Sequence, residues 1–284
     1  MVETIITKAA EEKGKCIRGL TLLDNELFVV SEKSSEVEVY DSTKLSFSCR
    51  FNLMDLFDPN DIVCCNRNKC LYIFDFRIRV QSAKIFRVDP HGKLIRTWLA
   101  GDGNIEGNLS VTDESNIILT VSNKSSLKEY SPDGQLVREI VMSPDANIRN
   151  PMHAIKLANG HFVVSHGSNL GLHRVCVVDT DGKLKKSFGR RCGSATGQLN
   201  FPVYLSVDGN GFVMVADRDN NQIVLLDSNL DFKRVILSKA EQHQLRYPFR
   251  ILLDESNGRL LVADNGWDSK KRKFADGRFL IFNL

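Results

Sequence analysis

The sequence has no hydrophobic stretch long enough to cross a membrane as a helix. Although 42% of its 284 residues are hydrophobic, no run approaches the ~18 consecutive apolar residues of a membrane-spanning helix. Residues 1–6 also lack the basic segment followed by an apolar one that marks a secretory signal peptide. We therefore expect no membrane partner.

Paired cysteine motifs are missing as well. The seven cysteines are odd in number, and none stands in a C-x-x-C pair. Cys16, Cys49, Cys64 and Cys176 fall in or beside apolar segments, where a free thiol behaves as a small hydrophobic group. This pattern predicts a reduced, cytoplasmic protein. The formal net charge of +3 is too small to indicate any class of partner.

Several catalytic motifs are also absent. The glycine-rich segment 189–197 lacks the G-K-[ST] ending of a phosphate-binding loop, and no helix pattern follows it. No G-x-S-x-G nucleophile motif occurs in the chain. We therefore expect a protein that is not an enzyme and that has no cofactor.

No window of the sequence keeps the i, i+3, i+4, i+7 apolar period of a long helix. A repeat is present instead, and it is clearest in the last third of the chain. Segments 197–227 and 244–283 each run from a proline through an apolar strand and a turn to a Val-Ala-Asp triplet, and then to a further apolar strand. A unit that recurs in this way cannot bury its own apolar face and must stack on its copies.

Four weaker copies precede these two. The six predicted second strands are 27–30, 71–74, 117–120, 161–164, 212–216 and 259–263. The third strands close on Asp41, Asp89, Ser131, Asp179, Asp227 and Asn283, which lie 42 to 56 positions apart. This spacing is typical of four-stranded propeller blades. The sequence therefore predicts an all-β fold: one six-bladed β-propeller domain over residues 1–284.

The two ends of the chain suggest how the ring closes. The sixth copy has only three strands before Leu284, and residues 4–7 form an unassigned apolar strand at the other end. We expect this N-terminal strand to supply the outer strand of the last blade, because that pairing removes an exposed sheet edge.

The repeat resembles the NHL repeat, most closely in blades five and six. The matching elements are Phe188-Gly189, 197–202, Asp208-Gly209, Val215-Ala216-Asp217 and 220–223 in blade five, with Tyr247-Pro248 and 262–265 in blade six. NHL propellers are most familiar as C-terminal domains of tripartite-motif (TRIM) ubiquitin ligases, where they bind RNA or proteins. No Cys/His zinc-ligand spacing is present. We expect a monomeric propeller, either within a larger protein or standing alone.

In a blade of this type, the first strand begins at the mouth of the central channel, on the face that we call the upper face. In blades four to six, a landmark proline (Pro151, Pro202 and Pro248) precedes the first strand, and counting two residues beyond it gives His153, Tyr204 and Arg250; the matching positions of blades one to three are Arg18, Asp61 and Asn108. A wet channel mouth would explain these polar residues without a ligand. The arc of Tyr204, Arg250 and Arg18 nevertheless suits an anionic ligand with a planar part, by bidentate pairing and stacking.

The loops between second and third strands are expected to form a second ring on the upper face. These positions are Glu32, Phe76, Ser122, His166, Arg218 and Asn265; Arg77 and Arg79 extend the loop of blade two, and Trp267, Lys270 and Arg272 that of blade six. A basic run in a loop is often only a solvated surface. The functional alternative is phosphate contact combined with base stacking.

An acidic residue closes the second strand of three blades. Asp75, Asp217 and Asp264 occupy this repeated position. A residue that recurs with the repeat serves the construction of the blade, so we expect these carboxylates to accept hydrogen bonds from neighbouring backbone groups.

Blade four is rich in histidine. His153, His166 and His173 could all approach its upper face, where they could hold a metal ion. Such a site would make the protein resemble six-bladed metal-dependent lyases and lactonases. The sequence does not place the carboxylate, Asn or His ligands of those families along the channel axis.

Together these features favour a non-catalytic recognition module that binds an anionic ligand, RNA or a nucleotide, at the axial mouth and the upper loops. The first alternative is a protein-interaction or substrate-recruiting domain of a ubiquitin-ligase-like protein. The second is a metal-dependent lyase or hydrolase. Steep weakening of binding by salt would distinguish phosphate recognition from recognition of an apolar peptide.

Overall fold

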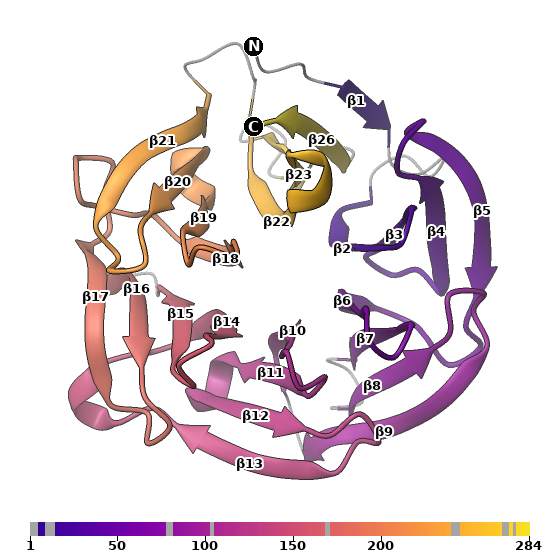
Figure 1. Ribbon diagram of the computed structural model, residues 1–284, viewed down its shortest axis with the longest axis horizontal. Helices are drawn as coiled ribbons and strands as arrows, with labels where there is room; N and C mark the ends of the chain where they lie inside the picture. The colour runs from indigo at the N-terminus through magenta and orange to yellow at the C-terminus, as the bar shows by residue number, and fades with distance from the viewer. Residues whose placement is uncertain are drawn as a thin grey trace.

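Six four-stranded antiparallel sheets surround a central axis in the computed structural model, which describes residues 5–8, 15–77, 82–102, 105–167, 171–239, 245–268, 273–274 and 277–284 (Figure 1). The predicted six-bladed, all-β propeller is thus confirmed. In blades one to five the strands run outward from the axis in chain order, as the alternation of short apolar strands and turns predicts. No helix in this part of the chain is long and apolar enough to cross a membrane.

The strands follow the predicted repeat closely. Blade one contains β2 (Ile17–Leu23), β3 (Glu26–Ser31), β4 (Glu36–Asp41) and β5 (Ser46–Asn52); blade two contains β6 (Pro59–Cys65), β7 (Cys70–Arg77), β8 (Ser82–Val88) and β9 (Leu94–Asp102); blade three contains β10 (Gly107–Val111), β11 (Ile117–Val121), β12 (Ser126–Tyr130) and β13 (Leu136–Val141). Blade four contains β14 (Pro151–Lys156), β15 (Phe162–His166), β16 (Leu172–Val178) and β17 (Leu184–Arg191); blade five contains β18 (Pro202–Val207), β19 (Val213–Asp217), β20 (Gln222–Leu226) and β21 (Phe232–Ser238).

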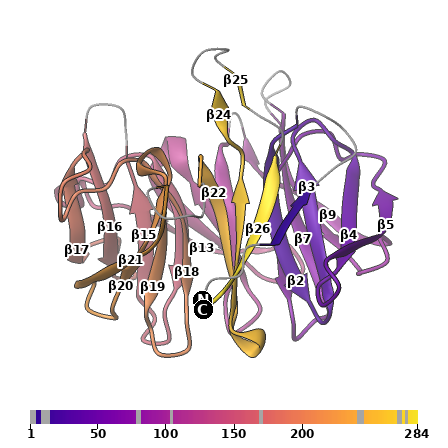
Figure 2. The same ribbon diagram turned by 90° about the horizontal axis from the view of Figure 1, so that it is seen from above.

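Blade six is built from both ends of the chain. Its strands β22 (Pro248–Asp254), β23 (Arg259–Asp264) and β26 (Arg278–Asn283) are joined by β1 (Ile5–Lys8), which pairs antiparallel with β26. The predicted closure is therefore confirmed (Figure 1). The short hairpin of β24 (Trp267–Asp268) and β25 (Lys273–Phe274) projects from one face of the disc (Figure 2).

The hydrophobic core lies between blades rather than within them. Six clusters of buried side chains are present in the described part of the chain, and each combines two neighbouring blades. In β3, for example, Phe28 and Val30 pack toward blade two, whereas Leu27 and Val29 pack toward blade six. Successive side chains of a strand point to opposite faces of its sheet. A strand whose two faces both pack against neighbouring blades is therefore apolar at successive positions. Burying each such side chain contributes roughly 1.5–3 kcal/mol.

Four of the inner strands begin with a proline, and each ladder shifts register directly after it. The shifts lie between Pro59 and Asp61, Pro151 and His153, Pro202 and Tyr204, and Pro248 and Arg250. Proline has no N–H and is tolerated at the first position of a strand. The bulge that follows it re-aims the residue two positions on, which is why that residue reaches the axis.

The cysteines are free thiols, as expected. Cys16 and Cys176 are buried and Cys64 is half-buried, in agreement with their apolar surroundings in the sequence. The expectation for Cys49 is wrong, because this residue is exposed on the outer strand β5.

Candidate functional site

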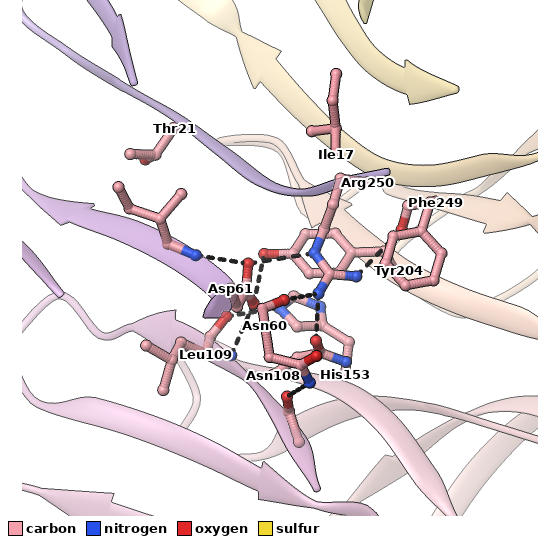
Figure 3. A network of polar contacts seen from close by, with 12 residues as sticks. Ile17, Thr21, Asn60, Asp61, Asn108, Leu109, His153, Tyr204, Phe249 and Arg250 are labelled. Carbon is pink, nitrogen blue, oxygen red and sulfur yellow. Dashed lines mark hydrogen bonds and ion pairs between the residues drawn. The ribbon is translucent and has the colours of Figure 1, made fainter. Parts of the chain in front are cut away.

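Arg250 lies at the centre of a polar network that joins the inner strands β22, β6 and β10 (Figure 3). Its Nε donates to Asp61 Oδ1 over 3.2 Å, and its Nη2 donates to the Asn60 carbonyl oxygen over 2.8 Å and to Asn108 Oδ1. Arg250 and Asp61 are only 2% and 0% exposed. Blade six is in this way tied to blades two and three.

Asp61 accepts hydrogen bonds from several sides. Its Oδ1 accepts from the backbone N–H of Ile62 and its Oδ2 from that of Leu109, both at 2.9 Å, and Tyr204 Oη lies 3.5 Å from Oδ2. Burial raises the pKa of the Asp61 carboxyl, while Arg250 and the two backbone donors oppose that shift. All the neighbours of this carboxylate are therefore groups of the protein itself.

His153 and Tyr204 continue the network as a stack. The His153 ring lies 3.7 Å from the Tyr204 ring, centroid to centroid, and the Arg250 guanidinium lies 4.6 Å from the Tyr204 centroid. His153 Nδ1 accepts from the Leu205 N–H over 3.3 Å, so Nε2 carries the hydrogen and donates to the Leu109 carbonyl oxygen over 3.0 Å. Burial lowers the pKa of His153 to about 3, and the Arg250 charge adds to this effect.

The structure therefore brings together five of the six residues predicted at the channel mouth: Asp61, Asn108, His153, Tyr204 and Arg250. They contact one another, whereas the sequence suggested that they would contact a ligand. Tyr204 and Arg250 are neighbours, as predicted, yet they face each other and Asp61. The expectation of a wet mouth at this depth is wrong, because Asp61, His153 and Arg250 are buried. Phosphate cannot reach the Nε of Arg250 while Asp61 occupies it.

The sixth position, in blade one, was assigned one residue too early. Ile17 pairs with Ser31 and Gly19 with Val30, so Gly19, and not Arg18, corresponds to Asp61. A Cβ on Gly19 would lie 2.6 Å from the Ile62 nitrogen. Blade one consequently contributes no side chain to the axis. Arg18 instead pairs with Glu32 over 2.9 Å and lies 5.8 Å from the Phe249 ring centroid.

A cavity of about 750 Å³ lies over this network on the upper face. Asn60 and Asn108 belong to both its lining and the Arg250 network, so the network forms its floor. The aromatic side chains of its lining are Phe76, Phe201 and Phe249, and its charged residues are Arg18, Asp58 and Glu106. The cavity thus offers apolar ring faces beside amide groups.

Arg218, predicted from the loop of blade five, is held between two aromatic rings. Its guanidinium carbon lies 4.0 Å from the Phe201 centroid and 4.5 Å from the Tyr247 centroid. Its Nε donates to Asp219 Oδ1 over 2.8 Å, and its two Nη groups have no hydrogen-bond partner among the described residues. The side chain is 15% exposed. This arginine is therefore fixed in place with an open edge.

The three histidines that were considered as metal ligands, His153, His166 and His173, hydrogen-bond to separate partners. His166 Nε2 accepts from Arg174 Nε over 3.1 Å, and His173 Nδ1 accepts from the Phe201 N–H over 2.9 Å. Burial lowers the pKa of His166 to about 3, with the Arg174 charge as the next cause. Within the described ranges, no group of three His, Cys, Asp or Glu side chains is arranged to hold a metal ion.

The acidic ends of the second strands have the structural role that was predicted. Asp75 accepts from the N–H of Asp58 over 2.6 Å, Asp217 from that of Asn200 over 2.6 Å, and Asp264 from that of Tyr247 over 2.7 Å. Each carboxylate thus fixes the chain that leads into its own blade.

The remaining predicted residues lie in the two basic loops. Phe76 is buried and lines the cavity. Arg79, Lys270 and Arg272 lie outside the described residues. For Arg77 and Trp267 only the backbone is described, at the end of β7 and in β24.

The counting rule also missed two residues of the cavity. Phe201 immediately precedes Pro202, and Phe249 immediately follows Pro248. The signal was present, since both are large aromatic residues directly beside the landmark proline. The rule selected only the position two residues further on, which faces the axis.

Comparison with known proteins gives one family and one fold. The family of eukaryotic translation initiation factor eIF2A matches residues 23–169, that is, 147 of the 284 residues. No curated protein sequence matches the chain. Similar solved structures include virginiamycin B lyase from Staphylococcus aureus (10% identity, TM-score 0.67, 100% of both chains covered), streptogramin B lyase (12%, 0.65, 100% of this chain and 87% of that chain) and a protein of unknown function from Bacteroides caccae (14%, 0.61, 81% and 84%). At these identities the structures show the fold alone.

Proposed function

The chain belongs to the family of eukaryotic translation initiation factor eIF2A, and from this premise we propose that it is a non-catalytic recognition module that binds RNA on the upper face of the propeller. The family name supports a role in translation initiation, where RNA is the common ligand. The proposal places the protein in the cytoplasm as a monomeric propeller. The NHL-like motifs of blades five and six lie outside residues 23–169. The resemblance to NHL repeats and the match to the eIF2A family therefore concern different parts of the chain.

The observation that carries this proposal is the position of Arg218 between Phe201 and Tyr247. A guanidinium stacked on two rings has already lost much of its rotamer freedom, so pairing it with a phosphate costs little further entropy. Its free Nη edge can donate two parallel hydrogen bonds to phosphate oxygens. Phe201 belongs to this stack and to the cavity lining, which connects a phosphate site with a place for a base.

The cavity itself suits a nucleobase better than a phosphate. Its charged lining residues are one cation, Arg18, and two anions, Asp58 and Glu106, so a phosphate inside it would meet net negative charge. Phe201 and Phe249 line it with aromatic rings, on which a base can stack, and Asn60 offers its amide oxygen, since its Nδ2 donates to the Gly107 carbonyl oxygen. About 750 Å³ lies within the usual range of small-molecule sites. We therefore place an unstacked base in the cavity and its phosphate on Arg218.

One observation favours a protein partner as a second candidate. Met54, on the loop between β5 and β6, is 97% exposed, although its neighbour Leu53 is buried. Phe57, on the same loop, is 60% exposed, and exposed apolar side chains that lie close together suit an interaction site. The lyase alternative has only the shared fold in its support.

Binding of single-stranded RNA to an Arg218→Gln variant tests the proposal. We expect at least a tenfold loss of affinity and a flatter salt dependence, because one phosphate contact is removed. Arg234→Gln is the matched control, since this exposed arginine lies on the outer strand β21. Equal affinity of Arg218→Gln and wild type would refute the proposal, and salt-insensitive binding of an apolar peptide would favour the protein partner.

A further inference from the structure

Blade four departs from the repeat at the upper end of its second and third strands. In blade six, Asp264 at the end of β23 faces Arg278 at the start of β26. The two side chains form an ion pair, in which Arg278 Nε and Nη2 donate to Asp264 Oδ2 over 2.9 and 2.7 Å. In blade four, His166 faces Arg174 at the same register position. Blade four thus shares the arginine of blade six but not its carboxylate, whereas the aspartates of blades two and five face Lys84 and Gln222.

Arg174 consequently lacks the counter-ion that Arg278 has in blade six. Its Nη2 donates to the Ala146 and Asn147 carbonyl oxygens over 2.7 and 3.1 Å, and its Nε donates to His166. No acidic side chain of the described chain lies within ion-pair distance of it, and Nη1 has no partner there. Arg174 is only 9% exposed. A buried cation without a counter-ion is costly, and an anion relieves this cost.

His166 cannot supply the missing negative charge. Its Nε2 accepts from Arg174, and the ring also hydrogen-bonds the backbone of Arg149, so Nδ1 carries the hydrogen. The ring is neutral at pH 7. The charged residues of the segment that leads into blade four, Arg149 and Asp145, are exposed. The positive charge of Arg174 therefore remains unbalanced.

This position adjoins the cavity of the upper face. Asn150 and Gly167 belong to the cavity lining, and they directly follow Arg149 and His166 in the chain. Arg174 and His166 are buried and do not belong to the lining themselves. An anion would therefore reach them only at the blade-four edge of the cavity, beside Asn150 and Gly167 and apart from Asp58 and Glu106 of blades two and three.

We propose that Arg174 forms a phosphate-binding subsite on the blade-four side of the upper face, created by the replacement of the repeat's aspartate with His166. The ligand is a phosphate group, which either a free phosphate or an RNA backbone can supply. The subsite depends on Arg174 and His166 and not on Arg218, so it stands independently of the proposed RNA site.

The decisive experiment restores the carboxylate of the repeat. A His166→Asp variant should pair with Arg174 as Asp264 pairs with Arg278, and should keep or raise the melting temperature. Inorganic phosphate, exchanged for chloride at constant ionic strength, should raise the melting temperature of the wild type by at least about 2 °C. The same exchange should leave His166→Asp unchanged. Asn159→Asp, which adds the same charge in a turn of the lower face, should keep the wild-type response.

The NMR signals of the histidine rings give a second readout on the unmodified protein. Phosphate should shift the ring signals of His166 and leave those of His161 unaffected, because His161 lies at the other end of the second-strand segment. A response to inorganic phosphate identifies a free anion as sufficient, and a response to single-stranded RNA alone identifies a backbone phosphate. The absence of both responses, to inorganic phosphate and to RNA, or an equal phosphate response in His166→Asp, would overturn the subsite. RNA that fails to bind while phosphate still shifts His166 would refute only the proposed RNA function.

Discussion

Arg250 of blade six and Asp61 of blade two, 189 positions apart in the sequence, form a fully buried ion pair of 3.2 Å. Blade one stands between these two blades in the ring, and its residue at this level is Gly19. Because Gly19 has no side chain, the arginine reaches past blade one and also bonds to Asn60 and Asn108. The pair therefore joins blades that do not pack directly on each other.

The ion pair predicts a large effect of a single substitution. Asp61→Asn would leave the Arg250 charge buried without a counter-ion, and should lower the free energy of unfolding by about 3–5 kcal/mol. Urea denaturation followed by circular dichroism measures this change. Arg250→Met should be similarly destabilising, because it leaves Asp61 unpaired.

The double variant Asp61→Leu/Arg250→Met, measured beside the single variants Asp61→Leu and Arg250→Met, provides the control for this interpretation. Replacing both charges by apolar groups removes the uncompensated charge, so the double variant should be more stable than the sum of the single effects predicts. Strictly additive effects would contradict a direct coupling of Asp61 and Arg250.

The sequence was sufficient for the fold but not for the function of the axial residues. Apolar strands, turns and a fixed period determine how blades stack, and each of these is local in the chain. Whether Arg250 faces a ligand or Asp61 depends on which side chains from distant blades come together at the axis. No local sequence pattern predicts such a long-range contact. The assignment of Arg18 failed for a related reason, since blade one has Ile17 where four of the other blades have the landmark proline. Arg218 was found because its loop position follows directly from the repeat.

Gly19 gives a second prediction, on packing at the axis. In Gly19→Ala the new Cβ would lie 2.6 Å from the backbone nitrogen of Ile62, which cannot move aside like a flexible side chain. We expect a loss of about 1–3 kcal/mol in the free energy of unfolding. Gly209→Ala is the matched control, because its Cβ would meet only the Glu255 carboxylate at 3.4 Å. Equal stability of the two variants would contradict the close packing at Gly19.

The burial of His153 should contribute to the loss of stability of the fold at acid pH. Its folded-state pKa of about 3 lies below the ordinary value of 6.5, so the unfolded chain takes up a proton that the folded chain does not. Its contribution to stability is complete above pH 6.5 and is lost as the pH falls toward 3. His153→Gln keeps one donor and one acceptor but does not titrate, and should reduce the slope of stability against pH by up to ~1.4 kcal/mol per pH unit. Chemical denaturation between pH 4 and 7 measures this slope, and an unchanged slope would exclude a neutral buried His153.

Asp217 should act in the opposite direction over an overlapping range. Burial raises its folded-state pKa from 3.8 to about 6, despite hydrogen bonds from Asn200, Asn220 and Gln222. Between these values the folded chain holds a proton that the unfolded chain has released, so the contribution of Asp217 is present below pH 3.8 and is lost as the pH rises through 6. The total loss is on the order of 2–3 kcal/mol. Asp217→Asn will be less stable overall, because the amide cannot accept all of these hydrogen bonds. Its stability should nevertheless rise more steeply with pH between 4 and 6 than that of the wild type, since only the opposing histidine effect remains. Parallel curves for the two proteins over this range would show that Asp217 is ionised throughout.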